Sequence, residues 1–247
     1  MRTIEHPQLP GPLHIGDDEP SLSRDELIAL YWHHHPRFRF LKMAPRAARL
    51  LDLGAGSGGL AVWKQWQAPA RPDLELHGCD LQRGEYAARY AAFHVLDFDG
   101  VRLPYPDGFF SAALSSHVIE HLRDQEHFAR EIHRVLQPGG RVYIETPTEA
   151  SCRFPPREFF LRAQLPTTTI NFFDDHTHTR ALRGPELTGL FERAGFATCE
   201  AGVIRTPYLE EVLLAKAAAR QDEELGSYGL WSKLGFAHYG LFEKPRG

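Results

Sequence analysis

The feature that most constrains the fold is an apolar run ending in a cluster of glycines, RLLDLGAGSGGL at residues 49–60. It predicts a strand, a tight loop and then a helix, because glycine adopts positive φ angles and lets the backbone approach a ligand closely. Two spacings coexist, Gly54-x-Gly56-x-Gly58 and Gly54-x-Gly56-x-x-Gly59. The second is also the fingerprint of dinucleotide-binding loops. The loop therefore predicts a nucleotide-like cofactor without identifying it.

Strand-like and helix-like segments alternate from this run to the end of the chain. Strands are predicted at residues 49–53, 74–80, 93–99, 109–116, 141–147, 196–204 and 238–245. Helices are predicted between them, at residues 59–67, 84–91, 121–136, 184–196 and 210–225. Such alternation indicates a mostly parallel sheet with helices on both faces. We expect an α/β, doubly wound sheet of about seven strands whose last strand is antiparallel.

The N-terminal segment, residues 1–45, is expected to be a lead-in followed by a helix that caps the site. Its first twenty residues are polar, rich in proline and glycine, and predicted to be irregular. The helix is expected to start after Ser21 or Ser23, which are suitable N-caps, and to stop at Pro36. The cofactor domain is expected to fill residues 46–247.

An insertion at about residues 148–183 interrupts the strand and helix pattern. It is too long for a simple connection, so it is expected to be a lid or a wall of the substrate site. Its aromatic residues predict either an apolar pocket for a small molecule or simple packing on a core. They are Phe154, Phe159, Phe160, Phe172 and Phe173.

The composition excludes several classes of function. With 43% hydrophobic and 24% charged residues, the chain is typical of soluble globular proteins. A net charge of -4 gives no electrostatic reason to expect nucleic-acid binding, which normally needs a basic face, although local basic patches stay open. Three scattered cysteines argue against a disulfide framework or a structural zinc site. No apolar run suggests a membrane span or a signal peptide. We expect a cytoplasmic monomer or homodimer with no nucleic-acid or membrane partner.

Four stretches, in this order, resemble the class I S-adenosylmethionine (SAM) dependent methyltransferases. They are LDLGAGSGG, HGCDLQ, DFDGVRLPYPDGFFSAALSSHVIEHLRD and EIHRVLQPGGRVYIETP. The likeness is strongest to the broad small-molecule group that includes ubiquinone-biosynthesis-like enzymes, and it covers about residues 45–245. Its specific part is the pair LPYPDGFF and RVLQPGG, which dehydrogenases do not carry after their third strand. The resemblance implies a Rossmann-like fold and SAM as the cofactor.

Three carboxylates, Asp52, Asp80 and Asp97, follow three successive predicted strands, where sheets of this kind bind ligands. Asp52 could help to hold the ammonium group of SAM, or it could cap the loop amides. Asp80 could accept hydrogen bonds from the ribose hydroxyls. The resemblance places the acceptor for the adenine amino group at Asp97, with Asp99 as a rival and a plain turn as the alternative. The other residues expected to contact the cofactor are Gly54, Ala55, Gly56, Leu81, Phe98 and Ser115.

Histidines are the candidates for a general base. Methyl transfer from a sulfonium is an in-line displacement that needs alignment of the reactants and exclusion of water. A hydroxyl acceptor also needs a base, and histidine titrates in the right range. The first candidate is His117, expected to point into the cleft, followed by His176 and His178. In an extended segment the last two would share one face, so hydrogen bonding or a metal held with Asp174 and Asp175 are alternatives. We expect no metal.

The sequence thus predicts a SAM-dependent methyltransferase that moves a methyl group to an oxygen or nitrogen atom of a small molecule. One alternative is an NAD(P)-dependent oxidoreductase, although no Tyr-x-x-x-Lys pair follows the later strands. A SAM-binding protein without turnover is the other alternative.

Overall fold

The computed structural model describes residues 2–16, 19–66 and 68–246. By its internal contacts the chain divides into two compact units. The first, here called the helical unit, comprises residues 1–36, 147–181 and 203–238. The second, here called the sheet unit, comprises residues 37–146, 182–202 and 239–247. The insertion predicted from the sequence falls almost wholly in the helical unit.

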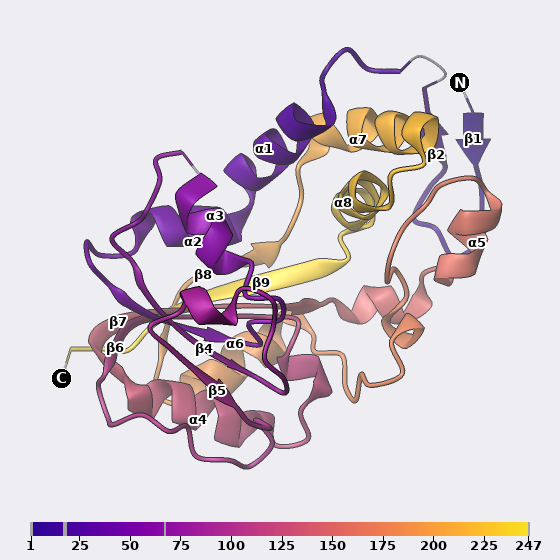
Figure 1. The fold of residues 1–247 in the computed structure, drawn as a ribbon. Helices are drawn as coiled ribbons and strands as arrows, with labels where there is room; N and C mark the ends of the chain where they lie inside the picture. The colour runs from indigo at the N-terminus through magenta and orange to yellow at the C-terminus, as the bar shows by residue number, and fades with distance from the viewer. Residues whose placement is uncertain (1, 17–18, 67, 247) are drawn as a thin grey trace. The chain divides into compact units, whose positions relative to one another are not determined.

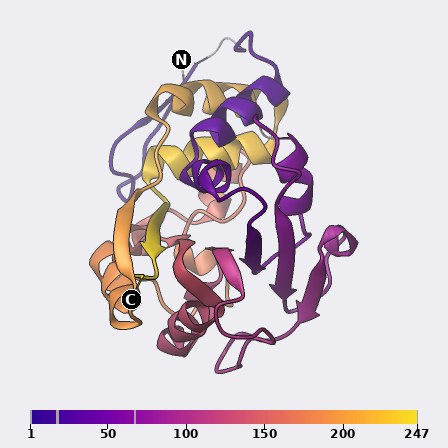
Figure 2. The ribbon, with the colours of Figure 1, turned by 90° about the vertical axis from the view of Figure 1, so that its left-hand side faces the viewer.

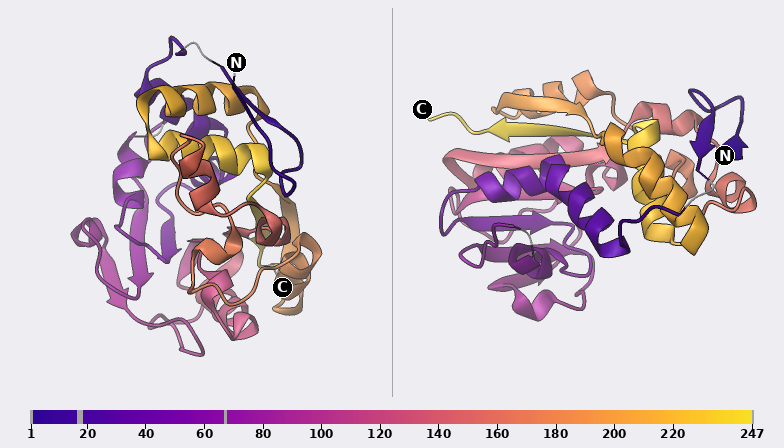
Figure 3. Two further views of the ribbon diagram at one scale, coloured as in Figure 1. Left: turned by 90° about the vertical axis from the view of Figure 1, so that its right-hand side faces the viewer. Right: turned by 90° about the horizontal axis from the view of Figure 1, so that it is seen from above.

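A seven-stranded sheet with the order β5-β4-β3-β6-β7-β9-β8 forms the framework of the sheet unit (Figure 1). Neighbouring strands from β5 to β7 pair in parallel, and the final strands run antiparallel. The strands also lie side by side in Figures 2 and 3. The expected fold class is therefore confirmed. The strands are β3 (Arg49–Leu53), β4 (Glu75–Asp80), β5 (Ala92–Val95), β6 (Phe110–Ser116), β7 (Leu136–Pro147), β8 (Ala197–Val203) and β9 (Ala237–Glu243).

Helices cover both faces of this sheet. One face carries α4 and α6, and the other carries α2 and α3 (Figure 1). The side chains of Leu51, Val142 and Ile144 belong to the buried cluster under α4 and α6. On the other face, Phe40 of α2 stacks on Tyr143 of β7, with ring centroids 5.9 Å apart. These helices are α2 (Pro36–Met43), α3 (Leu60–Trp66), α4 (Gln125–Val135) and α6 (Gly184–Arg193), with short 3-10 helices η1 (Ala87–Arg89) and η2 (Ile119–His121).

The two stretches that carry the specific part of the resemblance are bonded to each other. Arg134 on α4 donates to the carbonyl oxygens of Leu103 and Tyr105, at 3.0 and 2.8 Å. Glu131 on the same helix accepts from the backbone N–H of Leu103 at 2.8 Å. The LPYPDG segment is thereby fixed along α4, which explains why both stretches are needed to build this side of the sheet.

The helical unit contains a hairpin and several helices. Helices α7 and α8 pack along each other, and α1 contacts both. Tyr31 of α1 stacks on Tyr228 of α8, with ring centroids 4.3 Å apart. No helix within the described ranges is long and apolar enough to cross a membrane. The elements are β1 (Arg2–Ile4), β2 (Leu13–Ile15), α1 (Arg24–His34), η3 (Glu149–Arg153), α5 (Arg157–Arg162), η4 (Phe172–Asp174), α7 (Pro207–Arg220) and α8 (Glu223–Leu234).

Several expectations for the helical unit are wrong. The described part of the lead-in is irregular except for β1 and β2, which pair as an antiparallel hairpin that was not expected and that buries Ile4. The first helix does end before Pro36, as expected, but Pro36 also begins a second helix, α2, where its fixed φ suits a first turn. The helix expected over residues 210–225 is two helices that separate at Gln221, which adopts φ 52°. Asp222 then caps α8.

Other elements of the sheet unit also differ from expectation. Strand β5 ends at Val95, whereas the strand is expected to continue to residue 99. The segment 84–91 forms only the 3-10 turn η1 instead of a helix. Strand β7 begins at Leu136, five residues before the expected strand, because LQPGG bulges out of the ladder. Phe110 of β6 pairs with Leu136, whereas Ala112, two residues later, pairs with Arg141.

Arg71 closes the C-terminal end of α2. Its guanidinium donates to four backbone carbonyl oxygens at 2.8–3.1 Å and forms a bidentate pair with Asp73. Helix ends leave their last carbonyls without intrahelical donors, and this one side chain satisfies two carbonyls of α2 and two of the segment that follows it. The acceptors are Leu41, Lys42, Ala44 and Pro45.

We expect Arg71→Ala to lower the free energy of unfolding by about 2–4 kcal/mol, because it removes several buried charge-assisted hydrogen bonds together. Urea denaturation measures this loss. Arg130→Ala is the matched control, since Arg130 is 58% exposed and, among the described residues, forms an ion pair with Glu126 at 3.6 Å. This variant should cost no more than about 0.5 kcal/mol. Equal losses in the two variants would contradict the capping role.

Candidate cofactor site and its neighbours

The three glycines with positive φ in the loop after β3 have different surroundings. A Cβ on Gly54 would lie 2.1 Å from Val118 Cγ2, and one on Gly58 would lie 3.0 Å from the backbone of Tyr86. A Cβ on Gly56, whose φ is 55°, would meet nothing within 4 Å. Packing therefore requires glycine at positions 54 and 58. Gly56 is the loop position with open space in which a ligand could approach the backbone.

The rest of the loop is fixed by its own backbone. The N–H groups of Gly54 and Ala55 both donate to the carbonyl of Cys79 on β4, at 2.9 and 3.1 Å. The carbonyl of Gly59 accepts the first helical bonds, from Val62 and Trp63. Gly59 therefore belongs to the first turn of α3. A bound dinucleotide is not needed to explain its place in the sequence.

Asp80, at the end of β4, is bonded to the glycine loop. One carboxylate oxygen accepts from the N–H of Gly56 at 2.8 Å. Leu81, the next residue, has an apolar side chain that is 65% exposed, so a flat ligand could pack on it. A Cβ on Gly84 would lie 2.0 Å from the Gly56 carbonyl oxygen, so the chain after β4 packs directly on the loop. The predicted ribose and adenine contacts of Asp80 and Leu81 fit these positions and stay predictions.

The DFDG segment after β5 forms a turn. Asp97 accepts from the N–H of Asp99 at 3.0 Å. Asp99 in turn accepts from the N–H groups of Arg123 and Asp124, at 3.0 and 2.8 Å. Phe98 is buried in the core between the sheet and α4. Asp99 is therefore a structural bridge to the start of α4, and Asp97 stays the candidate of the two for the adenine amino group.

Asp52 ends β3 and is buried, with 4% of its surface exposed. It accepts a 2.6 Å hydrogen bond from the Tyr90 hydroxyl. Burial raises the pKa of Asp52 to about 6, with a further rise from Asp80, while the Tyr90 bond and the charge of Arg37 act in the opposite direction. A carboxylate that is this desolvated gains much from a cationic partner. The position suits an ammonium group, and this contact of Asp52 stays a prediction.

Ser115 and Ser116 end β6 with different partners. Ser115 is 1% exposed, and its hydroxyl has no hydrogen-bond partner among the described residues. Such orphaned buried hydroxyls are rare, and a polar ligand is one way to satisfy them. The Ser116 hydroxyl instead accepts from Arg37 of α2.

His117 lies between two buried carboxylates. It follows β6 with a φ of 55°, a left-handed conformation that is uncommon for residues other than glycine. Its Nδ1 is 3.2 Å from Glu120 and its Nε2 is 3.1 Å from Glu145. Glu145 also accepts from the Tyr143 hydroxyl and from Arg37.

This environment determines the charge of His117. Desolvation disfavours the imidazolium, but the hydrogen bonds to Glu120 and Glu145 outweigh it and raise the pKa of His117 to about 9. The ring is therefore protonated at neutral pH and has no lone pair with which to accept a proton. The geometry disfavours the expected role of His117 as a base and favours a structural ion pair.

His176 and His178 do not share one face of an extended strand. Residues 175–177 form a turn in which Asp175 accepts from the N–H of Thr177 at 2.8 Å. His176 is exposed. His178 Nδ1 lies 2.6 Å from the carbonyl oxygen of Phe172, which can only accept, so Nδ1 carries a proton.

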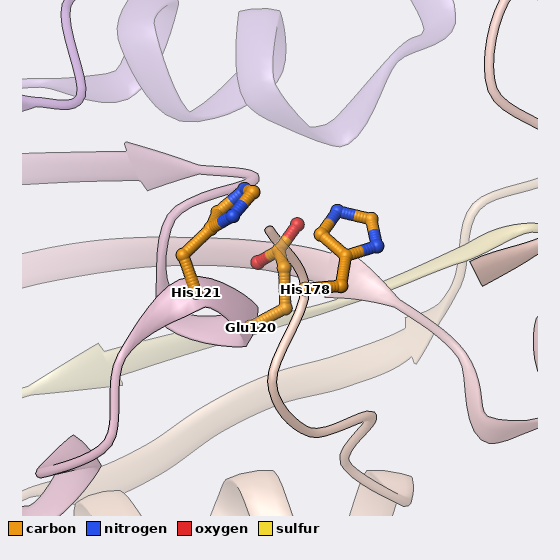
Figure 4. Close-up of side chains that lie close together, drawn as sticks. All are labelled: Glu120, His121 and His178. Carbon is orange, nitrogen blue, oxygen red and sulfur yellow. The ribbon is translucent and has the colours of Figure 1, made fainter. Parts of the chain in front are cut away.

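Asp174, one of the ligands of the alternative metal site, is already engaged in hydrogen bonds. Asp174 accepts from the backbone N–H groups of Arg157, Ile170 and Asn171, so its carboxylate holds the loop together. Figure 4 shows the side chain of His178, which belongs to the helical unit, and those of Glu120 and His121 from η2 of the sheet unit.

The aromatic residues of the insertion mostly form core. Phe154, Phe160 and Phe172 are at most 5% exposed, whereas Phe173 is 63% exposed. Packing on a core explains Phe154, Phe160 and Phe172, and this is the second of the two interpretations given for the insertion.

Sequence reasoning missed four polar residues of the site, Arg37, Tyr90, Glu120 and Glu145. Only Glu145 carries a local signal, as a charged residue inside the apolar strand RVYIETP. Arg37 and Tyr90 reach the site from segments whose place in the fold the local pattern does not give. Their roles become visible only with the tertiary contacts.

The charge of His117 predicts a pH dependence of stability. The folded-state pKa of about 9 lies above the unfolded value of about 6.5, so the stabilisation is complete below pH 6.5 and is lost as the pH rises through 9. Urea denaturation at pH 6, 7.5 and 9.5 should show a fall of about 1–3 kcal/mol relative to His117→Asn. Asparagine tolerates the left-handed conformation. Parallel curves for the two proteins would show that His117 is not held as a cation.

Comparison with known proteins gives the family. The sequence matches the family described as "Methyltransferase domain" over residues 28–201. A protein of Mycobacterium tuberculosis named "Probable S-adenosylmethionine-dependent methyltransferase" is 31% identical over 190 residues, which cover 75% of this chain and 63% of that protein. Demethylmenaquinone methyltransferase of Thermus thermophilus is 32% identical over 134 residues, covering 51% of this chain and 56% of that enzyme. The chain thus spans about three fifths of the length of these relatives.

A solved structure supports the fold. A SAM-dependent methyltransferase of Mesorhizobium loti superposes with a TM-score of 0.55 and 20% identity, over 84% of this chain and 96% of that one. SAM is the cofactor that the names of the relatives indicate. Because the family match extends over more than half of the sequence, the chain belongs to the class I SAM-dependent methyltransferases.

Proposed function

We propose that this protein transfers the methyl group of SAM to an oxygen or nitrogen atom of a small molecule. The observation that carries the proposal is the position of Asp52, Asp80 and Asp97 at one edge of the sheet, where Asp80 is bonded to Gly56 of the glycine loop. They stand at or just after the carboxyl ends of β3, β4 and β5, three adjacent strands of the sheet. Open space lies next to Gly56.

The charges of this edge favour SAM over a dinucleotide. Asp80 already accepts the Gly56 N–H, a donor of the type that phosphate-binding loops point at their ligand. A pyrophosphate would also meet the carboxylates of Asp52 and Asp80, and like charges repel. The methionine part of SAM carries an ammonium and a sulfonium, which such carboxylates attract.

The chain contributes binding and alignment to the reaction. When bound, SAM supplies an electrophilic methyl group. In this proposal Asp52 holds the ammonium group, Asp80 the ribose hydroxyls and Asp97 the adenine amino group. Orientation of this kind can account for much of the rate of a displacement that needs no acid for its leaving group. His117 fixes the end of β6 and moves no proton at neutral pH.

The acceptor and its base form the second part of the proposal. A relative acts, by its name, on demethylmenaquinone, which favours a small-molecule acceptor. An amine acceptor needs only to be neutral, whereas a hydroxyl needs a base. Nδ1 of His178 donates to the carbonyl oxygen of Phe172, and the role of this histidine as the base rests on the sequence alone. That role stays a prediction.

Calorimetry with SAM, S-adenosylhomocysteine and NAD tests the cofactor, and transfer of labelled methyl groups to a panel of small amines, phenols and quinols tests turnover. We expect binding of both sulfur compounds, no binding of NAD, and label in at least one acceptor. Binding of NAD alone would favour an oxidoreductase. SAM binding without transfer to any acceptor would favour a binding protein.

Asp80→Asn should weaken SAM binding about tenfold to a hundredfold, because the amide accepts fewer ribose hydrogen bonds and loses the charge. Asparagine keeps an oxygen that can accept from Gly56. Glu126→Gln, which removes an exposed carboxylate from α4, should leave the dissociation constant unchanged. Unchanged binding in Asp80→Asn would remove the ribose assignment.

A further inference from the structure

Tyr90 reaches Asp52 through a gap that a glycine leaves in the sheet. Asp52 of β3 and Gly78 of β4 are register partners in a parallel pair, so their side-chain positions share one face. A Cβ on Gly78 would lie 3.0 Å from Tyr90 Cδ1 and 2.6 Å from a ring carbon of Phe93. The two rings therefore lie directly over the bare backbone of β4. Without a side chain at position 78, the Tyr90 hydroxyl comes within 2.6 Å of Asp52.

The tyrosine is a neutral donor in this bond. It is 8% exposed, and burial and the neighbouring Asp52 raise its pKa far above the ordinary value. A phenol that stays protonated at every physiological pH can only donate to a carboxylate. Asp52 is therefore held in one orientation, with one of its oxygens occupied by the phenol.

Among the described residues, the other ionisable groups that act on Asp52 lie on two elements, α2 and β4. Arg37 of α2 favours its anionic form, Asp80 of β4 disfavours it, and burial disfavours it most. The Cys79 thiol on β4 lies near the charge of Asp52. It stays neutral, because burial and this charge both raise its pKa. The Tyr90 hydrogen bond is the largest of the influences that favour the anion.

We propose that Tyr90 is a positioning residue for the cofactor, whose hydroxyl keeps Asp52 ionised and aimed at the ammonium group of SAM. This inference rests on the proposed function. Nothing in the glycine loop or in the three carboxylates requires a tyrosine at this position. The bond makes SAM affinity depend on pH in the range where Asp52 titrates.

In the wild-type protein we expect SAM affinity to fall as the pH drops through about 6, the pKa of Asp52. Tyr90→Phe keeps the ring over Gly78 and removes only the hydroxyl. Loss of one hydrogen bond to the anion moves this midpoint up by about one pH unit. SAM should therefore bind about tenfold more weakly at pH 5.5 and with nearly unchanged affinity at pH 8.5.

Calorimetric titration with SAM from pH 5 to 8.5 measures these values. Tyr239→Phe is the matched control, since it also removes a hydroxyl that donates to a carboxylate, that of Glu200, at the β9–β8 end of the sheet. Its pH midpoint should equal that of the wild type. Asp52→Asn should bind SAM weakly with no midpoint in this range.

A loss of affinity in Tyr90→Phe that is equal at all pH values would overturn the proposal, because it would indicate a packing defect. If that variant does not fold, proton linkage in the wild type decides. At pH 6, SAM binding should release about half a proton, measured from binding enthalpies in buffers of different ionisation enthalpy. Zero release would overturn the inference while leaving SAM binding established. Absence of SAM binding at every pH would instead refute the proposed function.

Discussion

The site depends on one buried carboxylate. Glu145 accepts hydrogen bonds from Arg37 at 2.8 and 3.2 Å, from Tyr143 at 2.8 Å and from His117 at 3.1 Å. It thereby joins α2, β7 and the turn after β6 at a single point. A buried carboxylate is costly unless it is paired and fully hydrogen-bonded, and here its donors come from three directions. Loss of any one of them leaves charge uncompensated in a place where water cannot replace it.

The neighbouring Glu120 extends this arrangement. It accepts from Thr146 at 2.9 Å and shares His117 with Glu145. Two carboxylates therefore face one guanidinium and one imidazolium, and the formal charges of the group cancel when His117 is protonated. The left-handed backbone of His117 is maintained because both of its ring nitrogens are engaged. Strain of this kind persists only where the surroundings determine it.

Much of the sheet could be predicted because its strands are encoded locally. The segment RLLDL forms β3 at the expected residues. The observed bounds of β4 and β6 differ from the expected bounds by only one residue each. Buried parallel strands are continuous apolar runs in the sequence, so the end of each run can be located. The aspartates at the carboxyl ends of the strands are found in the same way. The hairpin β1–β2 escaped prediction because three-residue strands are too short to show a period. The break between α7 and α8 escaped because Gln221 gives no glycine or proline signal.

The candidate site was predictable in its positions but not in its charges. Sequence placed a histidine after β6, but its proton depends on Glu145, 28 residues further along the chain. It likewise placed Asp52 at the end of β3 without the phenol that lies 38 residues away. Local patterns specify which strand a residue ends. They do not specify which distant donor folds back onto it.

The bare backbone at Gly78 has a consequence for how this sequence can diverge. A ring can lie over β4 and reach β3 only while position 78 lacks a side chain. Any larger residue there would displace Tyr90 and Phe93 together, and a smaller residue at position 90 would leave a void above the glycine. In homologous sequences, positions 78 and 90 are therefore expected to change together. The two positions should covary although they are twelve positions apart in the sequence.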